Sequence, residues 1–351
     1  MLVLLPVSGK AAEAEEQLGE ALGVDALEDT ARDLELPLPG EVAEEPGSFL
    51  SRLVREALQA VLTKELLREM GCVMLASVVC AAFSVVGKAE SSGFDALSLG
   101  GAAAITLLLS GSQHALTVQT EQAVGKLQDV ANVLLPILSS AALLSGQVTA
   151  AAAKYAAAAL FFNVLVNLCC RFVLPVVRLY IAAALGEAVV GSGVLSGVLG
   201  FLRWCAVTAL SVLMLAFTLY LSLTSLTANA ADASVVRSAK TAMATLLPVV
   251  GSIAGDAASS LLSAAGVIRQ SVGVFGLMAV SAVLLGPFLA AGARGLLLKS
   301  VAAIAEGLSG GRIPRLLKRL SEAVTLLMGC LGACGLLLFF SVYALIGTVV
   351  I

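Results

Sequence analysis

The sequence predicts an all-α protein: a polytopic helical membrane protein with about seven or eight spans, some of them broken by proline or re-entrant. Of its 351 residues, 59% are hydrophobic and 13% are charged, and the mean hydropathy is +1.00. A soluble domain carries about 25% charged residues, so this chain has too little charge to cover a surface that faces water. A soluble enzyme, a disordered protein and a nucleic-acid-binding protein are therefore disfavoured as classes.

Residues 1–47 are predicted to form an acidic, extracytoplasmic segment with one or two short helices. The first 70 residues carry a net charge of −9, whereas the remaining 281 carry +6. The opening run MLVLLPV is apolar but has no basic residues before it, and secretory signals begin with a basic region. This start is either the remnant of a signal peptide or part of the mature chain.

Residues 48–70 are predicted to form an amphipathic helix that lies in the membrane interface. Apolar side chains recur there at spacings of three and four residues, and charged side chains occupy the opposite face. Such a helix buries its apolar stripe at the headgroup boundary. The alternative is that the stripe packs on a soluble partner.

Residues 71–351 are predicted to form the transmembrane domain, because a spanning helix needs about 20 apolar residues. The segment 243–266 either spans the membrane or re-enters it. Four prolines inside the runs, Pro136, Pro175, Pro248 and Pro287, free carbonyl groups that need a neighbouring helix or a wet cavity as partner. The apolar runs are 71–87, 97–112, 132–146, 155–170, 172–186, 201–226, 243–266, 272–292 and 324–351.

The segment 293–323 is predicted to be a basic cytoplasmic loop, since Lys and Arg concentrate in loops on the cytoplasmic side. It holds six basic residues against Glu306 and Glu322. This orientation places the C-terminus outside. The stretch from Ile313 to Val324 is amphipathic and is interpreted as an inner-leaflet anchor or, alternatively, as a binding site for a cytosolic partner.

Nothing in the sequence favours catalysis, a metal site or a cofactor. The seven cysteines lie in apolar stretches and are interpreted as small packing residues. His114 is the one histidine, and no CxxC is present. Ser112 and His114 are two residues apart, so on a helix they point in nearly opposite directions, and no GxSxG elbow or phosphate-binding GxxxxGK[ST] loop exists.

The segment 226–260 is the candidate site, because ionic residues there are set among Ala, Ser and Thr. Gly251 to Gly255 forms a small-xxx-small surface for helix contact. Asp256 follows directly, and a carboxylate inside a membrane is costly unless it is paired or wet. The segment either lines a path or docks a partner, or it is a re-entrant or interfacial helix pair with Asp256 at the water boundary. The candidate residues are Asp232, Arg237, Lys240, Pro248, Gly251, Gly255 and Asp256.

Two further polar pairs lie on the central runs. Arg171 and Arg178 are expected to snorkel to the headgroups. Asn163 and Asn167 are one helical turn apart and are expected to join helices by hydrogen bonds.

The segment 226–276 resembles the stage III sporulation protein AE family. The likeness extends over roughly residues 50–351 through the order of the apolar runs and the GGRIP motif before the last span, whereas the acidic region before Ser48 matches no family pattern. The central resemblance rests on Arg237-Ser-Ala-Lys240, Leu247-Pro248-Val249-Val250-Gly251, Asp256-Ala257, Val272-Gly273 and Gly276.

This resemblance implies a non-enzymatic membrane component of the sporulation channel, or feeding tube, that joins mother cell and forespore and supports late forespore gene expression. Its implied location is the mother-cell membrane around the forespore. The implied partners are the other stage III sporulation A proteins, among them an ATPase, and stage II sporulation protein Q. The alternatives from the residues alone are a stand-alone secondary transporter with a midplane site and a purely structural scaffold.

Overall fold

The computed structural model describes residues 19–20, 22–33, 51–55, 68, 71–75, 78–79, 93–144, 148–190, 193–246, 250–309 and 312–346. Side chains are described in these ranges except at 28, 93–99, 101–102, 148–151, 189, 221, 223–264 and 308–309. Nearly all of these residues are helical, and none of them is in a strand. The prediction of an all-α protein is confirmed.

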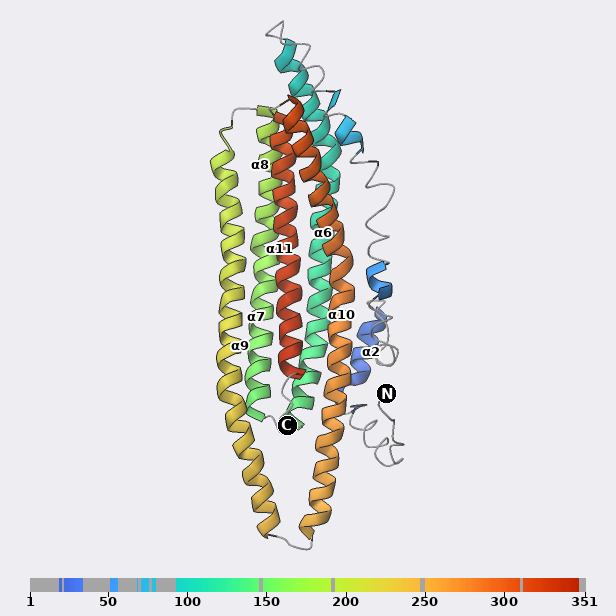
Figure 1. Cartoon of the computed structure of the whole chain (residues 1–351), viewed down its shortest axis with the longest axis vertical. Helices are drawn as coiled ribbons and strands as arrows, with labels where there is room; N and C mark the ends of the chain where they lie inside the picture. The colour runs from blue at the N-terminus through green and yellow to red at the C-terminus, as the bar shows by residue number, and fades with distance from the viewer. Residues whose placement is uncertain are drawn as a thin grey trace.

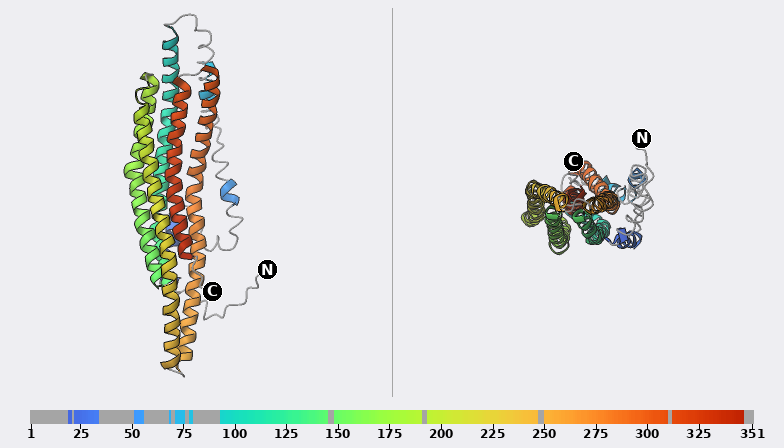
Figure 2. Two further views of the ribbon diagram at one scale, coloured as in Figure 1. Left: turned by 60° about the vertical axis from the view of Figure 1, so that its left-hand side comes forward. Right: turned by 90° about the horizontal axis from the view of Figure 1, so that it is seen from below.

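The helices form an up-and-down bundle (Figure 1). Helix α6 (Gly93–Leu144) is followed by α7 (Val148–Leu168), which continues through the π-helical segment η2 (Cys169–Val173) into α8 (Leu174–Val190). Helices α9 (Ser196–Leu246), α10 (Val250–Ser309) and α11 (Arg312–Ile346) complete the bundle. Figure 2 shows from a second side and from below that these rods lie alongside one another.

Five helical stretches are long and apolar enough to cross a membrane: Ala103–Leu144, Ala152–Ala188, Ser196–Tyr220, Ala265–Gly307 and Arg312–Ile346. The expected count of seven or eight is not confirmed in the described part of the chain. The run 97–112 and the described part of 132–146 share α6, and residues 250–266 share α10 with the run 272–292. Counting apolar runs separates them, but the polar residues between them favour helix as well, so the helices do not end there.

Proline residues lie inside these helices without ending them. Pro136 lies inside α6 and Pro287 inside α10. Before Pro175 the turn widens, and the Leu174 N–H donates to the Cys169 carbonyl five residues back. The proline ring excludes the carbonyl four residues earlier, which accounts for a π turn at this point.

Helix α11 occupies the middle of the bundle and contacts α6, α7, α8, α9 and α10 (Figure 1). Close approach of the helices depends on glycine at three positions. A Cβ added at Gly335 or Gly276 would overlap the methyl groups of Leu284 or Leu134, and one at Gly273 would overlap Ile346. A larger residue at any of these positions would require the facing leucine or isoleucine side chain to shift.

We call residues 221–246 of α9 and 250–264 of α10 the distal hairpin, and its far part projects beyond the other helices (Figure 1). It consists of the last turns of α9 and the first turns of α10. Helix α10 has 60 residues and is about 90 Å long, three times the hydrocarbon thickness of a membrane. In its described part the segment 243–266 is divided between the end of α9 and the start of α10, and whether it spans or re-enters the membrane stays a prediction.

The N-terminal region is described only in part. Helix α2 (Val24–Asp33) packs on α6 and buries Leu27 and Ala31. Within the predicted interfacial helix 48–70, residues 51–55 and 68 are helical, and the remainder lies outside the described residues, as do most of 1–47 and of the run 71–87.

Candidate functional site

Three helices share a zone without charged side chains, which we call the charge-free zone. It comprises residues 270–293 of α10 and 323–346 of α11, together with 204–220 of α9. At one edge Ser321 Oγ donates to the Gly295 carbonyl, and at the other Arg269 donates to the Ile346 carbonyl. Twenty-four helical residues span about 36 Å, which matches a hydrocarbon core of about 30 Å.

Glu322 connects three helices at one edge of this zone. Its Oε1 lies 3.2 Å from Arg203 Nη1 of α9, and its Oε2 accepts a hydrogen bond of 2.6 Å from Tyr180 of α8. Arg319 Nη1 lies 3.8 Å from the same carboxylate. Because Tyr180 is fully buried, this cluster is a structural joint as well as the start of a polar region.

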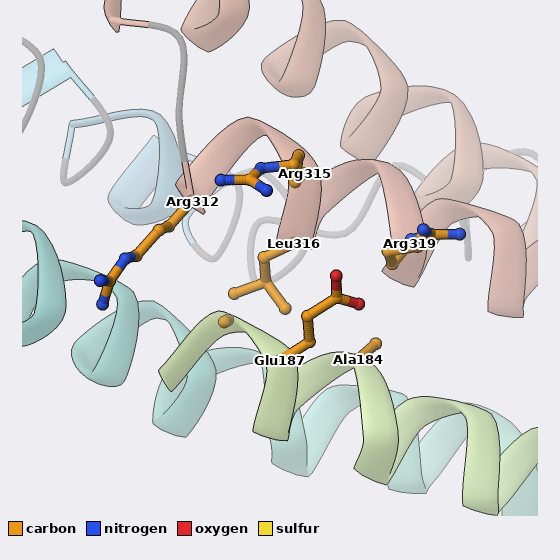
Figure 3. A pocket seen from close by; sticks show the side chains of 7 residues that line it. Ala184, Glu187, Arg312, Arg315, Leu316 and Arg319 are labelled. Carbon is orange, nitrogen blue, oxygen red and sulfur yellow. The ribbon is translucent and has the colours of Figure 1, made fainter. Parts of the chain in front are cut away.

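Beyond Glu322 lies the basic end of the bundle, where three arginines of α11 and Glu187 of α8 line a small hollow. The Glu187 carboxylate projects from α8 towards α11 (Figure 3), and its Oε2 is buried with no hydrogen-bond donor in the described part of the chain. The segment 293–323 was predicted as a loop, but it is helical through Ser309 and again from Arg312. Two of its basic residues lie inside α10 and four lie in the first turns of α11. The arginines are Arg312, Arg315 and Arg319.

A second polar surface, which we call the polar face, runs along α6 and the outer side of α7, η2 and α8. Apolar side chains such as Val164 are interspersed among its polar ones. Arg178 pairs with Glu121 across the two helices at 2.5 Å, so both stripes lie on one side of the bundle. Its exposed members are Gln122, Lys126, Asp129 and Asn132 of α6, and Asn163, Asn167 and Arg171 of α7 and η2.

The polar face lies at the depth of the charge-free zone. Leu134 packs over Gly276 of α10, and Asp129 is five residues, about 7.5 Å, from Leu134 towards the basic end. Cys169 Sγ lies 3.7 Å from Sγ of Cys334, which is midway along 323–346, and Arg171 follows Cys169 by two residues. Both charges thus lie near the middle of the zone, where exposure to lipid would cost about 2.5–3.5 kcal/mol each.

Two sequence expectations change here. Asn163 and Asn167 do not join helices: each is exposed and donates to a carbonyl of its own helix, Ala159 and Asn163 respectively. A backbone acceptor four residues back is always within reach of such a side chain. Snorkelling suits residues near helix ends, whereas Arg171 lies near mid-depth and Arg178 pairs with Glu121.

The remaining outer surface at this depth is apolar, and we call it the apolar face. On α9 the exposed side chains include Trp204, Val212, Leu215 and Leu219. On α11 they are Leu336, Phe339, Phe340 and Tyr343. This is the composition expected where helices meet lipid.

Six of the seven predicted site residues fall on the distal hairpin. Asp232, Arg237 and Lys240 lie on the last turns of α9, and Gly251, Gly255 and Asp256 on the first turns of α10, while Pro248 lies outside the described residues. Their side chains are outside the described part, so their role stays a prediction. The far part of the hairpin lies at the end of the bundle opposite the start of α11 (Figure 1).

Sequence reasoning missed two features. The Glu322 cluster gathers residues from three helices, and only its i,i+3 neighbour Arg319 is visible as a pattern. Cys169 meets Cys330 and Cys334 in the core, although these cysteines were interpreted only as small packing residues. The one available signal was the i,i+4 spacing of Cys330 and Cys334.

The fold, the charge-free zone and the apolar face together define a polytopic helical membrane protein, in agreement with the prediction. The profile of the stage III sporulation protein AE family matches residues 36–349, and the chain belongs to that family. The match includes residues 36–47, so the expectation that the acidic region before Ser48 matches no family pattern is wrong for that part. The stage III sporulation protein AE of Bacillus subtilis (strain 168) is 23% identical over 310 residues, 88% of this chain and 77% of that protein. No solved structure matches the chain.

Family membership makes this a stage III sporulation protein, as the resemblance at residues 226–276 predicted. Of the residues in that resemblance, Gly273 and Gly276 now have a structural role, because they let α10 approach α11 and α6 closely.

Proposed function

We propose that the chain is a non-enzymatic membrane component of the sporulation channel that joins mother cell and forespore and supports late forespore gene expression. It acts in the mother-cell membrane around the forespore, with the other stage III sporulation A proteins and stage II sporulation protein Q. Membership of the stage III sporulation protein AE family supports this proposal.

The observation that carries a channel role is the polar face at mid-depth. Lys126, Asp129 and Arg171 are exposed on the outside of the bundle, and lipid does not accept such a surface. In the assembled complex this face lines an aqueous path or contacts polar groups of a partner, while the apolar face meets lipid.

The distal hairpin is the docking element of this proposal. If the basic end is cytoplasmic, the hairpin and the end of α11 lie on the opposite side, towards the forespore. A hairpin that projects past the bundle (Figure 1) suits docking better than lining. Asp232, Arg237, Lys240 and Asp256 would supply its ionic contacts, with Gly251 and Gly255 as its contact surface.

Labelling of single introduced cysteines tests the polar face. Gln122→Cys and Asn167→Cys should react with a membrane-impermeant maleimide in sporulating cells, whereas Leu215→Cys and Leu336→Cys on the apolar face should not. The unmodified chain gives the background from the native cysteines. Equal labelling at all four positions would remove the argument for an aqueous path, and protection of Gln122→Cys only when partners are present would indicate a partner contact.

A double substitution tests the hairpin. Lys240→Ala with Asp256→Ala should block sporulation after engulfment while the protein still inserts in the membrane. The matched control, Lys299→Ala with Glu306→Ala, also removes one charge of each sign, from exposed positions on α10, and should sporulate normally. Normal spore yield from the hairpin variant would end the docking proposal, and solute transport by the purified protein alone would favour a secondary transporter instead.

A further inference from the structure

Three cysteines from two distant parts of the chain meet in the core of the bundle. Cys169 begins η2, while Cys330 and Cys334 are one turn apart on α11. The three sulfur atoms all lie within 4.8 Å of one another. Each of the three residues is fully buried, with 0% exposure.

The spacing of the sulfurs fits metal coordination. A thiolate sulfur lies about 2.3 Å from a bound zinc ion, so two sulfurs on one ion are about 3.8 Å apart in a tetrahedral site and about 4.0 Å apart in a planar one. The distance from Cys169 Sγ to Cys334 Sγ is 3.7 Å. The cluster therefore needs only small side-chain shifts to place three sulfurs around one ion.

The π turn contributes to this arrangement. The wide turn that starts at Cys169 changes the phase of the helix, leaving Cys169 buried against α11 while Cys170 is half-buried. Pro175 accounts for the wide turn physically, and π turns of one helical turn are frequent at functional sites. The helix thus presents one sulfur, rather than two, to the pair on α11.

The donor set selects the kind of ion. The cluster contains sulfur alone, with no carboxylate or imidazole, and soft thiolates prefer ions such as Cu(I) and Zn(II) to Mg(II) or Ca(II). Coordination removes the thiol protons, and three thiolates around one divalent ion leave the site with a net charge of −1. We propose that Cys169, Cys330 and Cys334 form a three-sulfur site for one thiophilic metal ion, which ties η2 to α11.

Cadmium is a suitable ion for the test, because its thiolate complexes give an ultraviolet charge-transfer band. The full chain, purified in detergent under reducing conditions, should bind one equivalent of Cd²⁺ with this band and a raised unfolding temperature. Cys334→Ala should bind at least about tenfold more weakly, since even changes outside the ligand shell cost that much. Cys205→Ser, a half-buried cysteine on α9 outside the cluster, is the matched control and should bind like the unmodified chain.

Further measurements separate the site from simple packing. The unfolding temperature of metal-free Cys334→Ala shows whether the variant is folded, and Cys330→Ala provides an independent second variant. Displacement of Cd²⁺ by Cu(I), with the same dependence on the three cysteines, would support the site and identify a monovalent ion as the one that it binds more tightly. No band, a band unchanged in both variants, or a Cys169–Cys334 disulfide with no metal uptake after reduction would overturn the proposal.

Discussion

The polar and apolar faces of the bundle lie at the same depth and differ in almost everything else. The apolar face presents Leu215 and Leu336, each more than half exposed, on helices that carry no charge over the whole zone. The polar face presents Asp129 and Arg171 near the middle of that depth. One side is therefore suited to lipid and the other to water or protein, and this asymmetry distinguishes a component of an assembly from a protein surrounded by lipid.

The largest expected effect comes from placing the same charge on each face. Leu215→Arg should cost about 3 kcal/mol, since arginine at mid-membrane is penalised and a leucine is lost, and should sharply reduce the amount of folded protein extracted from membranes. Asn167→Arg, at similar depth on the polar face, should be tolerated. Size-exclusion profiles of the two variants in detergent make the comparison, and equal loss from both would mean that the two faces share one environment.

The Glu322 cluster marks the edge of both faces and should show the next largest effect. Glu322→Ala leaves the buried Tyr180 hydroxyl without its acceptor and removes the partner of Arg203, for a loss of about 2 kcal/mol in the free energy of unfolding. Glu322→Gln retains an acceptor for Tyr180 and should lose less. Thermal unfolding in detergent measures both, with Glu306→Gln at an exposed site on α10 as the unaffected control.

The depth assigned to Asp129 depends on the contact between Gly276 and Leu134. Substitutions of two glycines of α10 test this contact. Gly276→Ala should destabilise the bundle by about 1 kcal/mol, because its Cβ overlaps Leu134 in a packed core. Gly266→Ala meets no atom within 4 Å and should stabilise the bundle by up to about 1 kcal/mol through helix propensity. Changes of the same sign in the two unfolding temperatures would contradict this register of α6 against α10.

The apolar face could be predicted from the sequence, whereas the polar face could not. Lipid contact requires an unbroken apolar stretch, which is a local property, so the runs 272–292 and 324–351 were predicted as part of the transmembrane domain. The polar face depends on how α6 is placed against α10, and that placement comes from contacts such as Leu134 with Gly276, far apart in the chain. The polar residues of α6 were therefore not predicted to belong to a span.

The same distinction explains the candidate sites. The ionic residues of 226–260 were predicted because unusual composition is local, although no pattern indicated that α9 and α10 would carry them beyond the bundle (Figure 1). Cys169 and Cys334 are 165 positions apart in the sequence. They meet only because η2 and α11 place them at the same depth in the bundle. Helix length also escaped prediction, because polar helix formers continue a helix past the end of its apolar run.

The smallest expected effect belongs to the pair of Arg178 and Glu121, which joins the two stripes of the polar face. Both side chains are 45% exposed, and exposed ion pairs contribute about 0.2–1 kcal/mol. A double-mutant cycle with Arg178→Gln and Glu121→Gln on the purified protein should therefore give a coupling energy in that range. If a partner covers the polar face, the pair is desolvated in the complex and its coupling energy rises. The same cycle, measured as retention of partners during co-purification, should then give a larger coupling energy. Equal couplings in the two settings would mean that the pair stays in water, which leaves an aqueous path as the environment of the polar face.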